Sequence, residues 1–174
     1  MRYSLLPHPD HPPSIPMALE VWVDRWEDGA VEFSFHLDCD PQAISLPPPT
    51  RPRRTDDLWK TTCFEAFVMD GAGYREMNFS PSGNWAAYVF TAYREGIAPF
   101  ELAAPPVIDL DTTTDGLILD AVVDLPQSGA FGLSAMIEEV SGIKSYWALA
   151  HPPGAPDFHH RACFAAALPP IAAP

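Results

Sequence analysis

The side chains of this sequence that could do chemistry gather in one stretch, residues 54–94. They combine aromatic, amide and charged groups: Trp59, Lys60, Glu65, Arg75, Asn78, Trp85 and Tyr88. Aromatic rings stack on the C–H faces of pyranose rings, while carboxylate, amide and guanidinium groups form hydrogen bonds with sugar hydroxyls. The combination is typical of a site that binds a small polar ligand, and we interpret it as a candidate saccharide site.

Within this set, Trp59 is the candidate for stacking on the ligand. It follows a long proline-rich loop, residues 41–54, and a large aromatic side chain at the end of such a loop can overhang a pocket. Glu65, Asn78 and Arg75 are the candidates for hydrogen bonds, since the amide of Asn78 alone offers two donors and an acceptor.

The histidines near the C-terminus are the candidates for a metal site: His151, His159 and His160. With Cys163 they follow the spacing H-x7-H-H-x2-C, which matches no standard zinc site. His159 and His160 are adjacent, so their side chains would point apart in an extended chain. We therefore predict no metal site and no metal cofactor.

The sequence contains no recognisable catalytic motif. A G-x-S-x-G nucleophile elbow does not occur, and residues 71–73 form a turn that does not lead into a helix, as a phosphate cradle would. Glu138 and Glu139 are neighbours and would face opposite sides of a strand, so they do not form a pair of glycosidase carboxylates. We expect a protein that is not an enzyme.

The elements that must position these residues are strands. Residues 63–69, 74–80 and 84–91 read as extended runs, separated by Asp-Gly-Ala-Gly and Pro-Ser-Gly turn signals. The links are too short for a crossover helix, so the runs are predicted to form an antiparallel meander.

Further strands are predicted on both sides of this meander. Alternating apolar and polar residues predict a hairpin from residues 19–24 and 31–37. Other runs occupy residues 107–110, 117–124, 131–140 and 144–150. About nine to eleven short strands without a clear helix are typical of an all-β antiparallel sandwich or barrel.

The chain is predicted to form a single β domain over residues 1–174. Residues 1–16, rich in proline and histidine, are predicted to form an irregular arm, and residues 151–174 a loop-rich tail. The 21 prolines disfavour long helices and favour short strands joined by long loops.

Glu65 is unusual because the run around it is apolar on both faces. A strand with this pattern is typically central and covered on both sides. A buried carboxylate without a partner is costly, so Arg75, Lys60 or Lys144 is expected to pair with it. The alternative is that Glu65 contacts a ligand, and the sequence leaves both roles open.

Composition excludes some classes of partner. The net charge of −13 argues against binding to nucleic acid, which needs a basic face. No run is long and apolar enough to span a membrane, and the N-terminus has no signal-peptide pattern. With three cysteines and no disulfide framework, the expected location is the cytoplasm.

Three segments give the sequence a family resemblance: FEAFVM, YREMNFSPSGNWAAYVF and SYWALAHPPGAPDFHH. In these the chain resembles bacterial DOMON-like domain proteins, which are related to the type-nine carbohydrate-binding modules. The resemblance implies an immunoglobulin-like or jelly-roll β-sandwich with a ligand site on its concave face. It also implies that Trp59, Glu65, Asn78 and Trp85 lie in or beside that site, and that the ligand is a small saccharide or sugar conjugate.

The same resemblance leaves haem as an alternative, because relatives in the wider superfamily bind it. An axial ligand would then come from His151 or His159, or from Met77 or Met136.

A third alternative is an interaction module that docks a partner or forms a homodimer. It would use exposed apolar loops such as residues 46–49 or 97–102.

Overall fold

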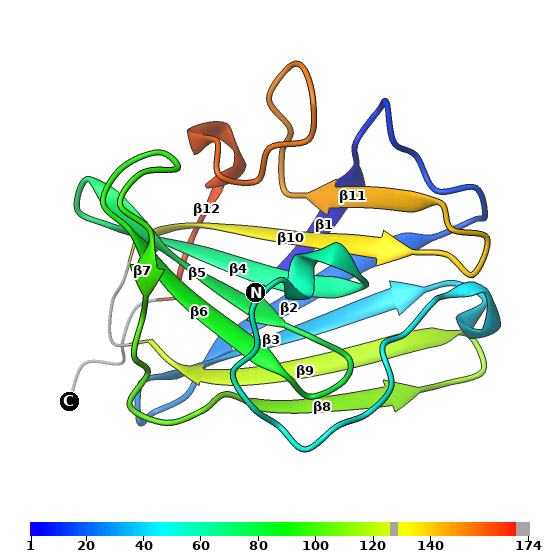
Figure 1. Cartoon of the computed structure of the whole chain (residues 1–174), viewed down its shortest axis with the longest axis horizontal. Coiled ribbons are helices and arrows are strands. Elements are labelled where there is room, and N and C mark those ends of the chain that lie inside the picture. The colour runs from blue at the N-terminus through cyan, green and yellow to red at the C-terminus, as the bar shows by residue number, and fades with distance from the viewer. Residues whose placement is uncertain (126–128, 170–174) are drawn as a thin grey trace.

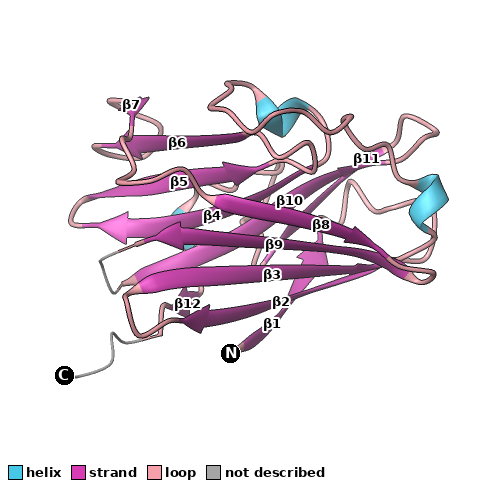
Figure 2. Ribbon diagram, turned by 90° about the horizontal axis from the view of Figure 1, so that it is seen from below, coloured by secondary structure: helices cyan, strands magenta, loops and turns pink. Residues whose placement is uncertain are grey.

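The computed structural model describes residues 1–125 and 129–169, which form one twelve-stranded sheet curled into two layers (Figure 1, Figure 2). One layer contains β1 (Arg2–Pro7), β2 (Ala18–Arg25), β3 (Ala30–Asp38), β8 (Val107–Thr112) and β9 (Gly116–Asp124). The other contains β4 (Cys63–Asp70), β5 (Gly73–Phe79), β6 (Trp85–Phe90), β7 (Ala98–Pro99), β10 (Ala130–Glu138), β11 (Lys144–Ala148) and β12 (Ala166–Ala167). Short 3-10 turns lie at η1 (Pro41–Ala43), η2 (Leu58–Lys60) and η3 (Arg161–Cys163).

The predicted all-β sandwich is confirmed. Every pairing between named strands in the described residues is antiparallel. The predicted hairpin is β2–β3, and the predicted meander is β4–β5–β6. Both follow from local turns, which explains why the sequence sufficed to find them.

The predicted irregular arm is wrong in part, because residues 2–7 form β1. The start of β1 pairs with β2, and its end pairs with β11, so this strand joins the two layers. Residues 8–17 contain no strand. The many prolines hid β1, although a proline at the end of a strand costs little. Residues 151–169 form the predicted loop-rich tail with η3 and β12; residues 170–174 lie outside the described part.

The core lies between the layers and is rich in aromatic side chains. Phe35 of β3 meets Phe64 of β4 with ring centroids 5.0 Å apart, and Phe33 meets Phe79 of β5 at 6.1 Å. All of these side chains are fully buried, so the contacts hold the layers together.

Strand β4 is covered on both faces, as its sequence predicts. Phe64, Ala66 and Val68 point into the core. The alternate residues Cys63 and Glu65 point away from the core, yet they are buried as well. Loops and the tail therefore cover the outer face of this layer, and the space they leave against it is the candidate site.

The role of β1 can be tested by a matched pair of substitutions. Leu5 is 3% exposed in the core and Leu6 is 57% exposed. We expect Leu5→Ala to lower the free energy of unfolding by about 2–5 kcal/mol, because it removes buried apolar surface and leaves a cavity. Leu6→Ala should change it by less than about 0.5 kcal/mol. Urea unfolding measures both, and equal effects would mean that β1 is not part of the core.

Candidate functional site

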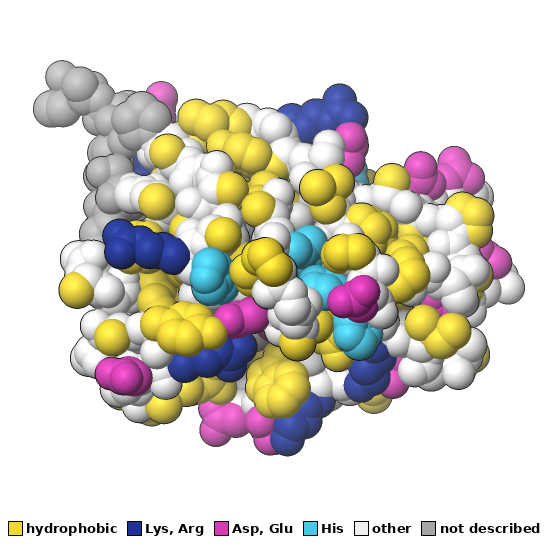
Figure 3. Space-filling model, turned by 90° about the horizontal axis from the view of Figure 1, so that it is seen from above, with side chains coloured by type: hydrophobic (Ala, Val, Ile, Leu, Met, Phe, Trp, Pro, Cys, Tyr) yellow, Lys and Arg dark blue, Asp and Glu magenta, His cyan; other side chains and the backbone are white. Residues whose placement is uncertain are grey.

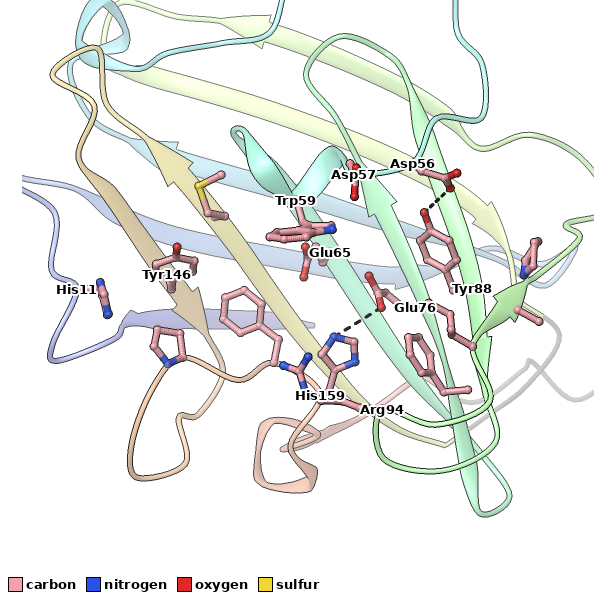
Figure 4. A pocket seen from close by; sticks show the side chains of 17 residues that line it. His11, Asp56, Asp57, Trp59, Glu65, Glu76, Tyr88, Arg94, Tyr146 and His159 are labelled. Carbon is pink, nitrogen blue, oxygen red and sulfur yellow. Dashed lines mark hydrogen bonds and ion pairs between the residues drawn. The ribbon is translucent and has the colours of Figure 1, made fainter.

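A cavity of about 780 Å³ lies on the outer face of the β6-β5-β4-β10-β11 layer (Figure 4). Its volume is in the range of small-molecule sites. Aromatic side chains make much of its wall: Trp59, Tyr88, Phe90, Tyr146 and Phe158. Its acidic lining residues are Asp56, Asp57, Glu65 and Glu76. The space-filling view of the face that carries the tail shows histidines gathered among hydrophobic side chains (Figure 3).

Strand register builds the floor of this cavity. Ser134 of β10 is paired with Glu65 of β4, which is paired in turn with Asn78 of β5. In the next row of the same face, Glu76 is paired with Tyr88 of β6. Residues paired across antiparallel strands share a face, so the two short turns of the meander and the long-range pairing of β10 with β4 bring these polar groups together.

The carboxyl group of Glu65 is the most deeply buried acid of the floor, with 3% of the residue exposed. Its Oε2 accepts a hydrogen bond from Ser134 Oγ at 3.0 Å. Burial, followed by the negative charge of Glu76, raises the pKa of Glu65 to about 8. Near neutral pH the group therefore holds a proton in the absence of a ligand.

The expected cationic partner of Glu65 does not exist in the described structure. Lys60 pairs with Asp57 at 2.7 Å, and Lys144 lies 3.7 Å from Glu138. Arg75 is on the opposite face of β5, where it bonds to Asp70 at 2.8 Å. The sequence predicted a cation because a buried carboxylate needs one; a protonated carboxyl needs only a neutral partner.

Glu76 is the second buried acid of the floor. Its Oε1 accepts a hydrogen bond from Asn78 Nδ2 at 2.7 Å, and burial raises its pKa. Glu65 and Glu76 thus stand close together with neutral donors, and each makes ionisation of the other less favourable.

His159 reaches the cavity from the tail. Its Nδ1 is hydrogen-bonded to the Tyr74 hydroxyl at 2.8 Å, and its Nε2 lies 3.9 Å from Glu76 Oε2. The ring packs against Phe67 and Phe90, and burial lowers its pKa to about 4, with a further contribution from the charge of Arg94. The imidazole is therefore neutral at neutral pH.

Arg94 fixes the tail against the loop after β6. Its guanidinium donates to Asp157 at 2.8 Å, and its backbone N–H donates to the Tyr74 hydroxyl at 3.2 Å. Since Asp157 precedes His159 by two residues, this ion pair holds the histidine in the cavity wall.

Trp59 lies on η2, and 53% of it is exposed. Lys60 Nζ stands 5.5 Å from the centroid of its ring and does not line the cavity. Beside it, the Tyr88 hydroxyl donates to Asp56 at 2.6 Å, which ties the segment before η2 to strand β6. Trp59 thus presents a large, half-exposed apolar ring in the wall of the cavity.

The structure brings only part of the predicted set together. Trp59, Glu65 and Tyr88 line the cavity, and Asn78 lies beneath them, bonded to Glu76. Lys60 lies outside, as its bond to Asp57 shows.

The prediction that Arg75 and Trp85 face the ligand is wrong. Both are on the face of the meander that turns toward the core: Trp85 is 8% exposed, and Arg75 lies over Phe100 at 4.2 Å. Because side chains alternate along a strand, Arg75 cannot share a face with Glu76.

Sequence reasoning did not place Glu76, Arg94, Tyr146 or Phe158 in the site, and it named His159 only as a candidate metal or haem ligand. A signal existed for Glu76: it shares the polar face of its strand with Asn78, which is opposite Glu65. The tail residues gave no such signal, since nothing local fixes where a proline-rich tail folds back.

The C-terminal histidines do not converge. His151 Nε2 is bonded to the Leu6 carbonyl at 2.8 Å, and His160 Nδ1 accepts from the Ala162 N–H. Within residues 1–125 and 129–169, no group of three or more His, Cys, Asp or Glu side chains is arranged to hold a metal ion.

The residues considered for haem are also dispersed. Met136 lines the cavity, but Met77 is in the core between the layers. Both ring nitrogens of His159 face protein groups, as described above.

Within the described part of the chain, no helix is both long and apolar enough to span a membrane.

No protein-family model matches the chain, and no curated protein matches it. The chain is similar to a solved carbohydrate-binding module of family 9 from Caldicellulosiruptor kristjanssonii in complex with glucose, with 10% identity, a TM-score of 0.49, and coverage of 82% of this chain and 71% of that chain. A complex of such a module with cellotriose gives 9% identity, a TM-score of 0.47, and coverage of 82% and 69%. Similarity this distant carries no information about the ligand, and the DOMON-like resemblance stays a prediction.

The burial of Glu65 predicts a pH dependence of stability. Glu65 has an ordinary pKa of 4.5 when unfolded and keeps its proton up to about pH 8 when folded. Its contribution to stability is full below pH 4.5 and is lost as the pH rises to about 8, by up to about 1.4 kcal/mol per pH unit. The lowered pKa of His159 makes the free energy of unfolding rise with pH, but only between about pH 4 and 6.5.

We therefore expect the free energy of unfolding to fall between about pH 6.5 and 8, and to fall less steeply in Glu65→Gln, which lacks the titrating group. Urea unfolding at a series of pH values gives both slopes. Parallel slopes for the two proteins would contradict the raised pKa of Glu65.

Proposed function

We propose that this protein binds a small saccharide or sugar conjugate in the cavity and does not catalyse a reaction on it. The observation that carries the proposal is the exposed ring of Trp59 in the wall of a cavity whose floor holds the carboxyl groups of Glu65 and Glu76. An aromatic face next to fixed polar groups suits a ligand that has an apolar C–H face and a ring of hydroxyls.

The polar groups are suited to hydroxyl recognition because they are held in place before a ligand arrives. Glu65 is fixed by Ser134, Glu76 by Asn78, and both stand on strands of the layer rather than on loops. A protonated carboxyl both donates and accepts, so it can bond to a hydroxyl in either sense. Preorganised groups of this kind lower the entropy cost of binding.

Binding without catalysis is proposed because the sequence contains neither a nucleophile elbow nor a phosphate cradle.

Substitution of Trp59 tests the proposal. If the ring stacks on the sugar, Trp59→Ala should weaken binding by about tenfold or more, which corresponds to about 1.4 kcal/mol. The measurement is isothermal titration calorimetry with the hexose that binds best in a panel of glucose, galactose, mannose and their disaccharides.

Trp26→Ala is the matched control, because Trp26 is 45% exposed and lies outside the cavity. Its affinity should equal that of the unsubstituted protein. Equal affinities of the Trp59 and Trp26 variants would show that Trp59 does not stack, and a panel without any binding would refute the saccharide proposal.

A further inference from the structure

One acid of the cavity wall, Asp57, is paired with Lys60, but in the described structure the other three lack a lysine or arginine partner. Each accepts a hydrogen bond from a neutral donor: Asp56 from Tyr88, Glu65 from Ser134, and Glu76 from Asn78. In the described part of the chain, none of these carboxyl groups lies within ion-pair distance of a lysine or arginine. These three carboxyl groups are therefore free to form an ion pair with a cationic group of a ligand.

The basic groups nearby are already engaged. Arg94 itself lines the cavity, but its guanidinium donates to Asp157 at 2.8 Å; its charge lowers the pKa of Glu76 without an ion pair to that carboxyl group. Lys60 is paired with Asp57. His159 is neutral, and His11 lines the cavity with its ring against Tyr146 at 5.3 Å.

The aromatic wall adds to this preference. Cations are attracted to the faces of Trp and Tyr rings, by about 0.5–1 kcal/mol at exposed sites and by more where water is excluded. Trp59, Tyr88 and Tyr146 line the same cavity as the unpaired acids. Aromatic rings beside carboxyl groups are a combination that selects ammonium groups over neutral ones.

We propose that the ligand is an amino sugar with a free primary amine, and that its ammonium group sits between Glu65 and Glu76. The inference rests on the proposed saccharide function and narrows it. Glu65 is paired with Asn78, and Glu76 stands two residues along the same strand on the same face. The acids are thus diagonal neighbours, close enough for one ammonium to donate to both.

Binding would replace the proton of the Glu65 carboxyl group with the ammonium group of the ligand. Without ligand, Glu65 keeps its proton because burial penalises the carboxylate. An adjacent ammonium stabilises the carboxylate, so the proton leaves for solvent as the ligand enters. No bond other than the O–H of the carboxyl is broken, and the charge in the cavity is conserved.

The test compares three ligands of one shape on the full chain: glucosamine, N-acetylglucosamine and glucose. The titrations are run at about pH 6, where the amine is protonated before it binds. We expect glucosamine to bind about tenfold tighter than either neutral sugar, which is about 1.4 kcal/mol. In buffers of different ionisation enthalpy, the heat of glucosamine binding should vary with the buffer as a proton is released, while the heat of glucose binding should not.

Variants separate the acids from the rest of the site. In Glu65→Gln the preference for glucosamine over glucose should collapse toward equality, and proton release should disappear. Glu76→Gln is a second variant, which serves if the first does not fold. Glu27→Gln is the matched control, because Glu27 is exposed on the turn between β2 and β3 and lies outside the cavity, so it should keep the full preference.

The outcomes distinguish the two proposals. If glucose binds in a Trp59-dependent way and glucosamine binds no tighter, the amino-sugar inference is wrong and the saccharide function stands. If none of the three sugars binds, the amino-sugar inference is wrong, and if no sugar of the wider panel binds either, the saccharide function is wrong as well. A preference for glucosamine that persists unchanged in both the Glu65 and the Glu76 variants would also overturn the placement of the ammonium group.

Discussion

The site depends on the burial of one carboxyl group, that of Glu65, on a strand covered on both faces. Its residue is 3% exposed, and its hydrogen-bond partner is the hydroxyl of Ser134 rather than a cation. Burial without a countercharge is costly for a carboxylate, so the protein holds the neutral acid and places Glu76 beside it. In the proposed complex, the Glu65 carboxyl group in the floor of the cavity would lose its proton when a cationic ligand binds beside it.

Rigid and irregular parts of the chain have different roles around this floor. The strands fix the acids, because paired residues on neighbouring strands share a face. The loops supply the walls, and specific polar contacts hold them: Arg94 with Asp157, and Tyr88 with Asp56. Such an arrangement allows a precise floor with walls whose chemistry can vary independently.

The two-layer architecture makes that division possible. The contacts of Phe33 and Phe35 with the opposite layer form the core without drawing on the outer face. Strand β1, which pairs with both β2 and β11, closes the layers at one side. The main core therefore lies on one face of the β4-β5-β6 meander, while the other face combines small apolar clusters, such as Phe67 with Tyr74 and Phe90, with the polar groups of the cavity.

The sequence by itself determined the β2–β3 hairpin, the β4-β5-β6 meander and which residues of each of these strands share a face, since alternation and tight turns are local. It also marked Trp59, Glu65 and Tyr88, which line the cavity. Only the tertiary structure decided that Arg75 and Trp85 turn to the core, that β1 is a strand, and that the tail brings His159 to Glu76. These depend on contacts between segments far apart in the chain, which no local pattern encodes.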